Sequence, residues 1–272
     1  MKIGFGWYGG KLSHLDWLLP LLPTDAHHYV EPFGGSMAVL LNKKPSPMET
    51  YNDLDGDLVN FFRVLRNREE ELQRKLSLTF YSRQEYENAL IRDPEDDEIE
   101  LARKFFLRAR MTTMGLAQKA KKGRWQHVIQ SHNQVLKWWK SIDGLSDIAS
   151  RIMRVQIEHM SAVELINKYD FDEAFFYLDP PYVHESRVST CRNEYFYEMS
   201  RSEHIELAKL LRSIKGRFAL SGYNCPFMEE HYRWCKRYDS KSKRASSGKN
   251  SRVESVWCNY IPAKFRQDSF NF

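Results

Sequence analysis

Short apolar runs alternate with glycine- or proline-containing turns in the first and last thirds of the chain. The clearest run is residues 174–178, Ala-Phe-Phe-Tyr-Leu, which ends abruptly at Asp179-Pro180-Pro181-Tyr182. An aromatic-rich run that stops at two prolines predicts a buried strand followed by a rigid turn. Because proline fixes φ and has no N–H, this turn presents a carboxylate, backbone carbonyls and an aromatic ring. In open α/β sheets, the C-terminal edge of a strand is where ligands bind.

Other strands are predicted by apolar or alternating runs, and helices by apolar positions three or four residues apart. The expected strands lie near residues 29–31, 48–52, 155–158, 217–221 and 254–261. The expected helices lie near residues 12–19, 37–41, 58–76, 99–110, 133–142, 145–153, 162–168 and 201–214, with a short helix after Ser82. Ser82 with Glu85, and Ser200 with Glu203, form capping boxes. The pattern predicts an α/β fold: a Rossmann-like sheet flanked by helices, interrupted by a mainly helical insertion over residues 58–145.

Composition narrows the possible classes of protein. With 272 residues, 42% of them hydrophobic, the chain can form a large core. We find no apolar run of membrane-spanning length and no apolar signal core, so no membrane partner is expected. The four cysteines form no CxxC pair, which argues against a zinc site, predicts no metal, and fits a reducing cytoplasm.

Positive charge is concentrated in two segments, although the net charge is only +5. Residues 101–140 contain ten Lys or Arg and no acid, and residues 236–252 contain seven against the single acid Asp239. Tryptophans near these segments, at 125, 138, 139 and 234, add to the indication of a polyanionic partner. A solvated basic face is the simpler alternative. We expect residues 236–252 to be mobile when unbound, because they are rich in Ser, Lys and Gly.

One of two glycine turns suggests a nucleotide-like ligand. Gly9-Gly10-Lys11 is not a phosphate loop, because Phe5 and Leu12 occupy the positions where that motif needs Gly and Ser or Thr. The turn at residues 33–36 lies between a strand and a helix, and Asp53 follows about 20 residues later, where an acid reaches ribose hydroxyls. The turn is not GxGxxG, so a dinucleotide is not implied. Asp55 and Asp57 are explained by helix N-capping.

In this order, the motifs resemble those of the Dam-type DNA adenine-N6 methyltransferases, which use S-adenosylmethionine. The matching segments are residues 7–11, 31–36, 51–53, 179–182 and 220–223. The resemblance covers nearly the whole chain. It implies a catalytic S-adenosylmethionine-binding domain formed by residues 1–56 and 151–272. It also implies that the insertion, residues 57–150, is a mainly helical target-recognition domain.

The resemblance also implies roles for individual residues. The expected catalytic residues are Asp179, Pro180 and Tyr182, and the expected cofactor-binding residues are Trp7, Tyr8, Lys11, Phe33, Gly34, Gly35, Ser36, Asp53 and Asp179. Ser161 departs from the pattern, since many relatives have an acid there. For Trp7 and Lys11, core packing and a surface charge are the simpler alternatives.

The chemistry explains why such a turn suits an exocyclic amine. Adenine N6 is a poor nucleophile because its lone pair is delocalised into the ring. Asp179 and the Pro180 carbonyl can each accept one N6–H, which frees the lone pair for attack on the sulfonium methyl. Tyr182 offers a face for stacking a flipped base, at about 1–3 kcal/mol.

The expected partner is double-stranded DNA. Candidate DNA-binding residues are Arg110, Lys119, Lys121, Lys122, Arg124, Lys241, Lys243 and Arg244, of which Arg124 best suits guanine readout. The resemblance further implies site-specific methylation that yields S-adenosylhomocysteine. It also implies a monomer, a bacterial, phage or prophage context, and a role in restriction–modification. Two alternatives stay open: methylation of cytosine N4 or of RNA, and a catalytically silent nucleic-acid-binding protein.

Overall fold

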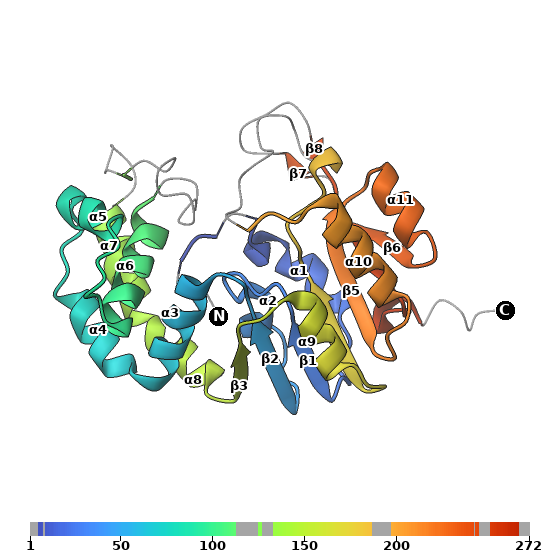
Figure 1. Cartoon of the computed structure of the whole chain (residues 1–272), viewed down its shortest axis with the longest axis horizontal. Coiled ribbons are helices and arrows are strands. Elements are labelled where there is room, and N and C mark those ends of the chain that lie inside the picture. The colour runs from blue at the N-terminus through green and yellow to red at the C-terminus, as the bar shows by residue number, and fades with distance from the viewer. Residues whose placement is uncertain are drawn as a thin grey trace.

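A twisted sheet forms the centre of the molecule (Figure 1). The computed structural model describes residues 5–7, 9–112, 125–126, 133–186, 197–241, 243–244 and 251–266. Within this part the strands are β1 His28–Glu31, β2 Met48–Asn52, β3 Val155–Glu158, β4 Ala174–Leu178, β5 Arg217–Tyr223, β6 Lys236–Asp239 and β9 Glu254–Cys258. They form a seven-stranded sheet in the order β3-β2-β1-β4-β5-β9-β6.

The first five strands in this order are parallel, and β9 is antiparallel to both of its neighbours. The strand order reverses between β1 and β4, which is where ligands bind in open α/β sheets. The predicted α/β, Rossmann-like fold is therefore confirmed.

Helices cover both faces of the sheet, so its central strands are buried throughout. On one face, Phe176 and Leu178 pack with Leu165 of α9 (Ala162–Tyr169) and Leu207 of α10 (Arg201–Leu211). On the other face, Phe175 and Tyr177 join the cluster that contains α1 (Leu15–Leu18) and α2 (Ala38–Asn42). The short helices η1 (Lys11–His14) and η2 (Leu19–Leu21) flank α1.

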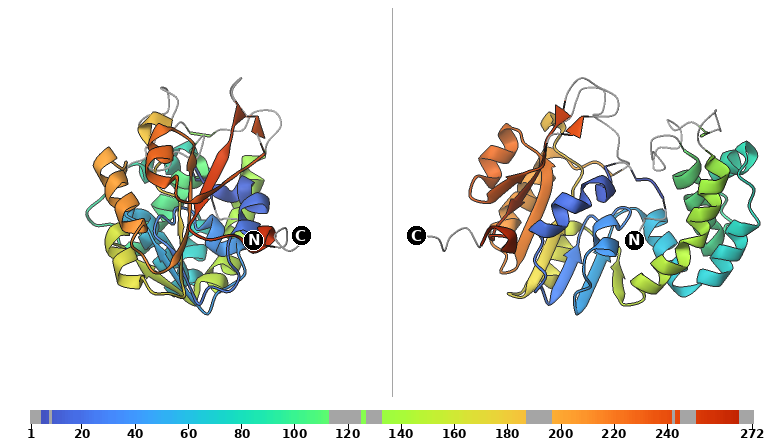
Figure 2. Two further views of the ribbon diagram at one scale, coloured as in Figure 1. Left: turned by 90° about the vertical axis from the view of Figure 1, so that its right-hand side faces the viewer. Right: turned by 180° about the vertical axis from the view of Figure 1, so that it is seen from behind.

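The insertion is helical, as predicted. Its described helices are α3 Gly56–Asn67, α4 Glu69–Ser77, α5 Arg83–Ala89, α6 Glu98–Met111, α7 Gln134–Asp143 and α8 Leu145–Ile152. They stand beside the β3 edge of the sheet (Figures 1 and 2). Phe61 of α3 stacks on Phe106 of α6 at 5.6 Å, and Phe5 packs against both, so one apolar cluster runs from the sheet into these helices.

Helix caps follow the sequence signals closely. Asp55 caps α3 by accepting from the backbone N–H of Asp57 and Leu58. Ser200 and Glu203 form the predicted capping box, and Ser161 forms another with Glu164 at α9. At α5, Ser82 accepts from the Glu85 N–H as predicted, but the Glu85 carboxylate pairs with Arg103.

Several predictions need correction. The segment at residues 236–252 is not irregular throughout, because residues 236–239 form β6 and hydrogen-bond to β9. Lys243–Arg244 (β7) and Ser251–Arg252 (β8) pair as a two-stranded hairpin. The predicted helix at 58–76 is two helices, α3 and α4. Helix α11, Pro226–Tyr232, was not predicted, although a proline at its first position is a start signal.

The remaining described elements are short: η5 His184–Ser186 and η7 Ala263–Phe265. Among the residues that the structure describes, no helix has the length and apolar character needed to cross a membrane.

Candidate functional site

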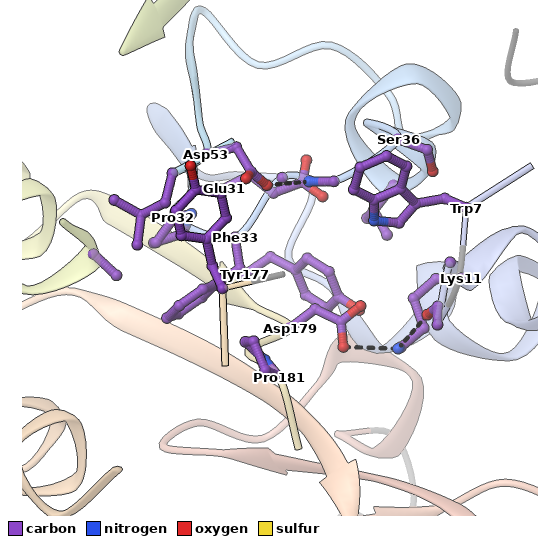
Figure 3. Close-up of a pocket in the computed structure, with 18 of the residues that line it drawn as sticks. Trp7, Lys11, Glu31, Pro32, Phe33, Ser36, Asp53, Tyr177, Asp179 and Pro181 are labelled. Atoms are coloured by element: carbon purple, nitrogen blue, oxygen red, sulfur yellow. Dashed lines mark hydrogen bonds and ion pairs between the residues drawn. The ribbon is translucent and has the colours of Figure 1, made fainter. Parts of the chain in front are cut away.

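A cavity of about 210 Å³ opens at the C-terminal edge of the sheet, beside the point where the strand order reverses. Figure 3 shows side chains from widely separated segments converging on it. Its lining includes the predicted cofactor residues Trp7, Lys11, Phe33, Gly34, Gly35, Ser36, Asp53 and Asp179. Tyr8 lies outside the described residues. The cavity thus brings together motifs that lie up to 172 positions apart in the sequence.

The turn after β1 has room only for glycine at positions 34 and 35. A Cβ on Gly34 would lie 2.0 Å from Cε2 of Tyr51, whose ring is fully buried. Gly35 has a φ of +47°, and a Cβ there would lie 2.8 Å from Nε1 of Trp7. The turn therefore packs its backbone directly against two aromatic rings, which leaves its other side free to approach a ligand.

Asp53 fixes the turn from the end of β2. Its Oδ2 accepts from the Gly35 N–H at 2.8 Å, and its Oδ1 accepts from the Asp55 N–H at 2.9 Å. Burial raises the pKa of Asp53 to about 6, although these backbone hydrogen bonds oppose the shift. Each carboxylate oxygen has a second lone pair, so the side chain can still accept from a hydroxyl in the cavity.

Asn52 supports this region, and its role was not predicted. Its side-chain amide donates to the carbonyls of Pro32 and Met160, at 2.9 and 3.0 Å, and accepts from the Met160 N–H at 2.9 Å. The ends of β1, β2 and β3 are thereby held together beneath the cavity. The signal was available, because Asn52 is part of the matching segment at residues 51–53.

The turn after β4 carries a compact charged cluster. The Lys11 ammonium lies 2.7 Å from Oδ1 of Asp179 and 3.4 Å from Oε1 of Glu254, and it donates to the Gly9 carbonyl at 3.1 Å. It also lies 5.0 Å from the centre of the Tyr182 ring. The Tyr182 hydroxyl donates to Glu254.

Burial controls the electrostatics of this cluster. Burial alone would lower the pKa of Lys11, but the charges of Asp179 and Glu254 outweigh it and leave that pKa raised. Burial also raises the pKa of Asp179; the Lys11 ammonium opposes this shift and Glu254 adds to it. Lys11 therefore stays charged, while two carboxylates share its single positive charge.

Two acidic residues of the site were missed from the sequence. Glu31, at the end of β1, lines the cavity and is only 2% exposed, and its Oε2 has no hydrogen-bond donor among the described residues. Burial and the nearby Asp179 raise the pKa of Glu31. Glu254 enters from β9. The matching segment at residues 31–36 contains Glu31, whereas no motif marked Glu254.

The Asp179-Pro180-Pro181-Tyr182 turn separates two spaces. Asp179 and Pro181 line the large cavity, whereas Pro180 and Tyr182 line a small adjoining hollow together with residues 220–223 of β5. In that hollow, Tyr182 packs edge-to-face on Tyr223 with 4.9 Å between ring centres. The predicted catalytic residues thus face both sides of one turn.

The candidate DNA-binding residues are not assembled into one described surface. Lys119, Lys121, Lys122 and Arg124 lie outside the described residues, as do the side chains of Lys243 and Arg244. Lys241 is exposed. Arg110 is partly buried and donates to the Lys137 carbonyl at 3.0 Å, so it ties α6 to α7.

Three cations of the acid-free stretch form ion pairs within the protein. Arg103 pairs with Glu85 and Glu100, Lys104 pairs with Asp96, and Arg108 pairs with Asp57. All four acids lie outside the stretch. Trp138 is only 1% exposed and belongs to the core, whereas Trp139 is exposed. Ser161, the departure from the family pattern, serves as the N-cap of α9.

Comparison with known proteins agrees with this geometry. Residues 7–246 match the profile of the D12 class N6 adenine-specific DNA methyltransferases. The chain is 25% identical over 258 residues to the Type II methyltransferase M1.LlaDCHI of Lactococcus lactis subsp. cremoris, covering 90% of this chain and 89% of the relative. It is 26% identical over 254 residues to the Type II methyltransferase M.MjaIII of Methanocaldococcus jannaschii, covering 83% of this chain and 86% of the relative.

The family profile spans the glycine turn, the acid after β2 and the turn after β4, so both the resemblance and the adenine N6 activity that it implied are confirmed. Cytosine N4, RNA and a silent binding protein are not supported as alternatives. Membership implies DNA as the substrate and S-adenosylmethionine as the methyl donor. The chain belongs to the D12 class of N6 adenine-specific DNA methyltransferases.

Proposed function

We propose that this enzyme flips its target adenine out of double-stranded DNA and presents N6 across the Asp179-Pro180-Pro181-Tyr182 turn. The observation that carries the proposal is the position of this turn, with the large cavity on one side and the hollow at Tyr182 on the other. A methyl donor in the cavity and an adenine against Tyr182 would meet at Asp179. A base inside a duplex cannot reach such a turn, so flipping is required.

The residues around the cavity fit S-adenosylmethionine, which supplies a methyl group on a cationic sulfur when bound. In our proposal the backbone at Gly34 and Gly35 approaches the ligand, and Asp53 accepts from the ribose hydroxyls. Glu31 supports this fit, because a buried carboxylate with an unpartnered oxygen suits a ligand that carries positive charge. Trp7 and Phe33 provide apolar contact at the rim.

In our proposal Lys11 has a role in addition to the expected contact with the cofactor. An ammonium has three N–H donors, and the Asp179 carboxylate, the Gly9 carbonyl and the Glu254 carboxylate surround it. A contact with the methionine carboxylate would have to replace one of these. We therefore assign Lys11 first to holding Asp179, and only second to the cofactor.

Methyl transfer then depends mainly on positioning and charge. Asp179 and the Pro180 carbonyl accept the two N6–H groups, so the nitrogen lone pair points at the methyl carbon. Once N6 gains the methyl group it would be cationic, and it would release one N6 proton to Asp179 or to water. Because the methyl group is already activated by the sulfonium charge, orientation supplies most of the acceleration.

Target recognition is assigned to the helical insertion, residues 57–150, and to the basic segment at residues 236–252. We also propose that the protein is a monomer and that it acts in the cytoplasm, in a bacterial, phage or prophage setting. The two named relatives are Type II methyltransferases, which supports a place in restriction–modification.

The decisive experiment is to methylate DNA with the purified protein and S-adenosylmethionine, and then to map the modified bases by sequencing. We expect N6-methyladenine at one short recognition sequence. Asp179→Ala should abolish transfer, because the amine loses its carboxylate acceptor. Asp172→Ala is the matched control, since Asp172 is exposed and lies just before β4, at the opposite end of the strand from Asp179. Wild-type turnover by Asp179→Ala would overturn the proposal.

A further inference from the structure

Glu254 is buried beside the catalytic turn, although it lies 72 positions from Tyr182 in the sequence. It is the first residue of β9, and only 4% of it is exposed. One of its carboxylate oxygens accepts from the Tyr182 hydroxyl and lies 3.4 Å from the Lys11 ammonium. Glu254 therefore contacts two of the residues that surround Asp179.

The backbone of Glu254 is itself held firmly. It pairs with Tyr223 across the β5–β9 ladder, its N–H donates to the Ser240 hydroxyl at 3.0 Å, and its carbonyl accepts from the Ser240 N–H at 2.8 Å. Tyr223 also packs edge-to-face on Tyr182. The β5–β9 strand pair thus holds both the Glu254 carboxylate and the Tyr182 ring that it contacts.

We propose that Glu254 is a positioning residue for methyl transfer, which fixes the ring of Tyr182 through its hydroxyl and shares the Lys11 ammonium with Asp179. This inference rests on the proposed roles of Asp179 and Tyr182.

The hydrogen bond to Tyr182 fixes ring orientation. Van der Waals contact along the ring leaves an aromatic side chain free to tilt, whereas a hydrogen bond from its hydroxyl to a carboxylate fixes the far end of the ring. Bonds of this charge-assisted type are about twice as strong as neutral ones. A ring held in this way presents a constant face on which the flipped base can stack.

The contact with Lys11 preserves the acceptor strength of Asp179. If Lys11 met Asp179 alone, the two charges would cancel and the ammonium would compete fully with adenine for the carboxylate. With Glu254 present, two carboxylates share one ammonium, so the cluster keeps a negative charge near the amine. Burial of a second carboxylate costs desolvation free energy. Folding alone gives no reason to bury Glu254 here, which favours a role in the site.

Glu49 shows what a purely structural buried carboxylate looks like in this chain. Its side chain is 3% exposed, close to the 4% of Glu254, but it is bound by two cations, Lys43 and Arg151, at the N-terminal end of β2. It does not line the cavity. Glu49 and Glu254 therefore match in burial and differ in their relation to the catalytic turn.

The test compares Glu254→Gln with Glu49→Gln. We expect Glu254→Gln to lower kcat about tenfold or more, because small displacements of reacting groups have effects of that order. The KM for S-adenosylmethionine should stay within about twofold, because Glu254 is not among the residues that line the cavity. Glu49→Gln should lower the melting temperature without changing kcat. An unchanged kcat in folded Glu254→Gln would overturn the inference.

A double-mutant cycle tests the path through Tyr182. Tyr182→Phe keeps the ring but removes the donated hydrogen bond, so it should lower kcat on its own. Glu254→Gln should then have a clearly smaller effect in the Tyr182→Phe background than in the wild type. Equal effects in both backgrounds would count against the inference. If Glu254→Gln does not fold, a wild-type kcat in Tyr182→Phe would overturn it.

Failure of this inference can be told apart from failure of the proposed function. Active Asp179→Ala would remove the proposed site altogether. Inactive Asp179→Ala together with fully active Glu254→Gln would leave the site in place and exclude only the positioning role of Glu254.

Discussion

At the scale of single residues, the carboxylate of Asp53 offers a direct test of cofactor binding. Burial raises its pKa to about 6. In the proposed function the ionised form accepts hydrogen bonds from the ribose, so cofactor binding should favour the carboxylate over the acid. Affinity for S-adenosylmethionine should therefore be constant above about pH 7 and fall as the pH drops through 6, by about tenfold per further unit. Calorimetric titration at several pH values would measure it.

Asp53→Asn separates this effect from other titrations in the cavity. Glu31 and Asp179 also face the cavity and also have raised pKa values, but both remain in the variant. The difference in pH dependence between wild type and Asp53→Asn therefore belongs to Asp53. Identical profiles for the two proteins would show that Asp53 does not bind the cofactor as an ionised group.

Residues within continuous motifs could be placed from the sequence, and residues brought in by topology could not. Gly34 and Asp53 could be predicted because a strand, a turn and a spacing of about 20 residues define their geometry. Glu254 could not, because its approach to Tyr182 depends on β9 inserting antiparallel between β5 and β6. That insertion is a property of the sheet, and no local pattern near Glu254 encodes it.

At the scale of an element, the glycine turn between β1 and α2 is the most constrained part of the site. Gly34→Ala places a methyl group 2.0 Å from the Tyr51 ring. That ring cannot move freely, because it is buried and packs on Phe62 at 5.2 Å between ring centres. We expect the free energy of unfolding to fall by about 1–3 kcal/mol, as in overpacked cores, together with loss of cofactor binding. Chemical denaturation would measure the first effect.

Gly6→Ala is the matched control for this substitution. Gly6 is exposed, and a Cβ built there meets nothing within 4 Å. It should change stability by less than about 0.5 kcal/mol, as surface substitutions usually do. Gly34→Ala with wild-type stability and cofactor affinity would mean that the turn has more room than the structure gives it.

Elements with a strong local signal were predicted well, and the exceptions have physical causes. Strands β2, β3 and β4 were predicted at their observed bounds, because β4 is a short apolar run, β2 and β3 mix apolar and polar residues, and each ends at a polar turn. Strand β6 was missed because its basic, mostly exposed residues resemble a mobile segment. Its order comes from backbone hydrogen bonds to β9, which composition does not reveal.

Over the whole molecule, the position of a basic residue in the folded structure indicates its role better than its presence in a basic stretch of sequence. In the acid-free stretch, Arg103 and Arg108 form ion pairs that join α6 to α5 and α3, and Lys104 pairs with Asp96 in the turn before α6. The basic segment that follows β6 differs from this stretch in where it lies relative to the cavity. Strand β6 runs parallel to β5, since both are antiparallel to β9, so the chain leaves β6 at the same edge as the cavity. Figure 1 shows the β7–β8 hairpin projecting beyond that edge.

We therefore expect basic residues of this segment to contact the phosphates of DNA bound over the cavity. Replacing Lys241, Lys243 and Arg244 by Ser should weaken binding to all sequences alike. The slope of log affinity against log salt should become shallower by about 2–3, since each phosphate contact contributes about 0.9. Fluorescence anisotropy with cognate and non-cognate duplexes at several salt concentrations would measure both effects.

The matched control removes the same number of charges from the opposite edge of the sheet. Lys44, Lys209 and Lys215 are exposed; Lys44 and Lys215 precede β2 and β5, and Lys209 lies in the last turn of α10. Their replacement by Ser changes the net charge equally but should leave the salt slope nearly unchanged, because these positions face away from the cavity. If both triple variants flatten the slope to the same extent, DNA responds only to net charge, and the edge at residues 241–244 makes no specific phosphate contact. A flattened slope in the first variant alone would place the DNA backbone along this edge, beside the turn at which we propose that Asp179 receives the adenine amine.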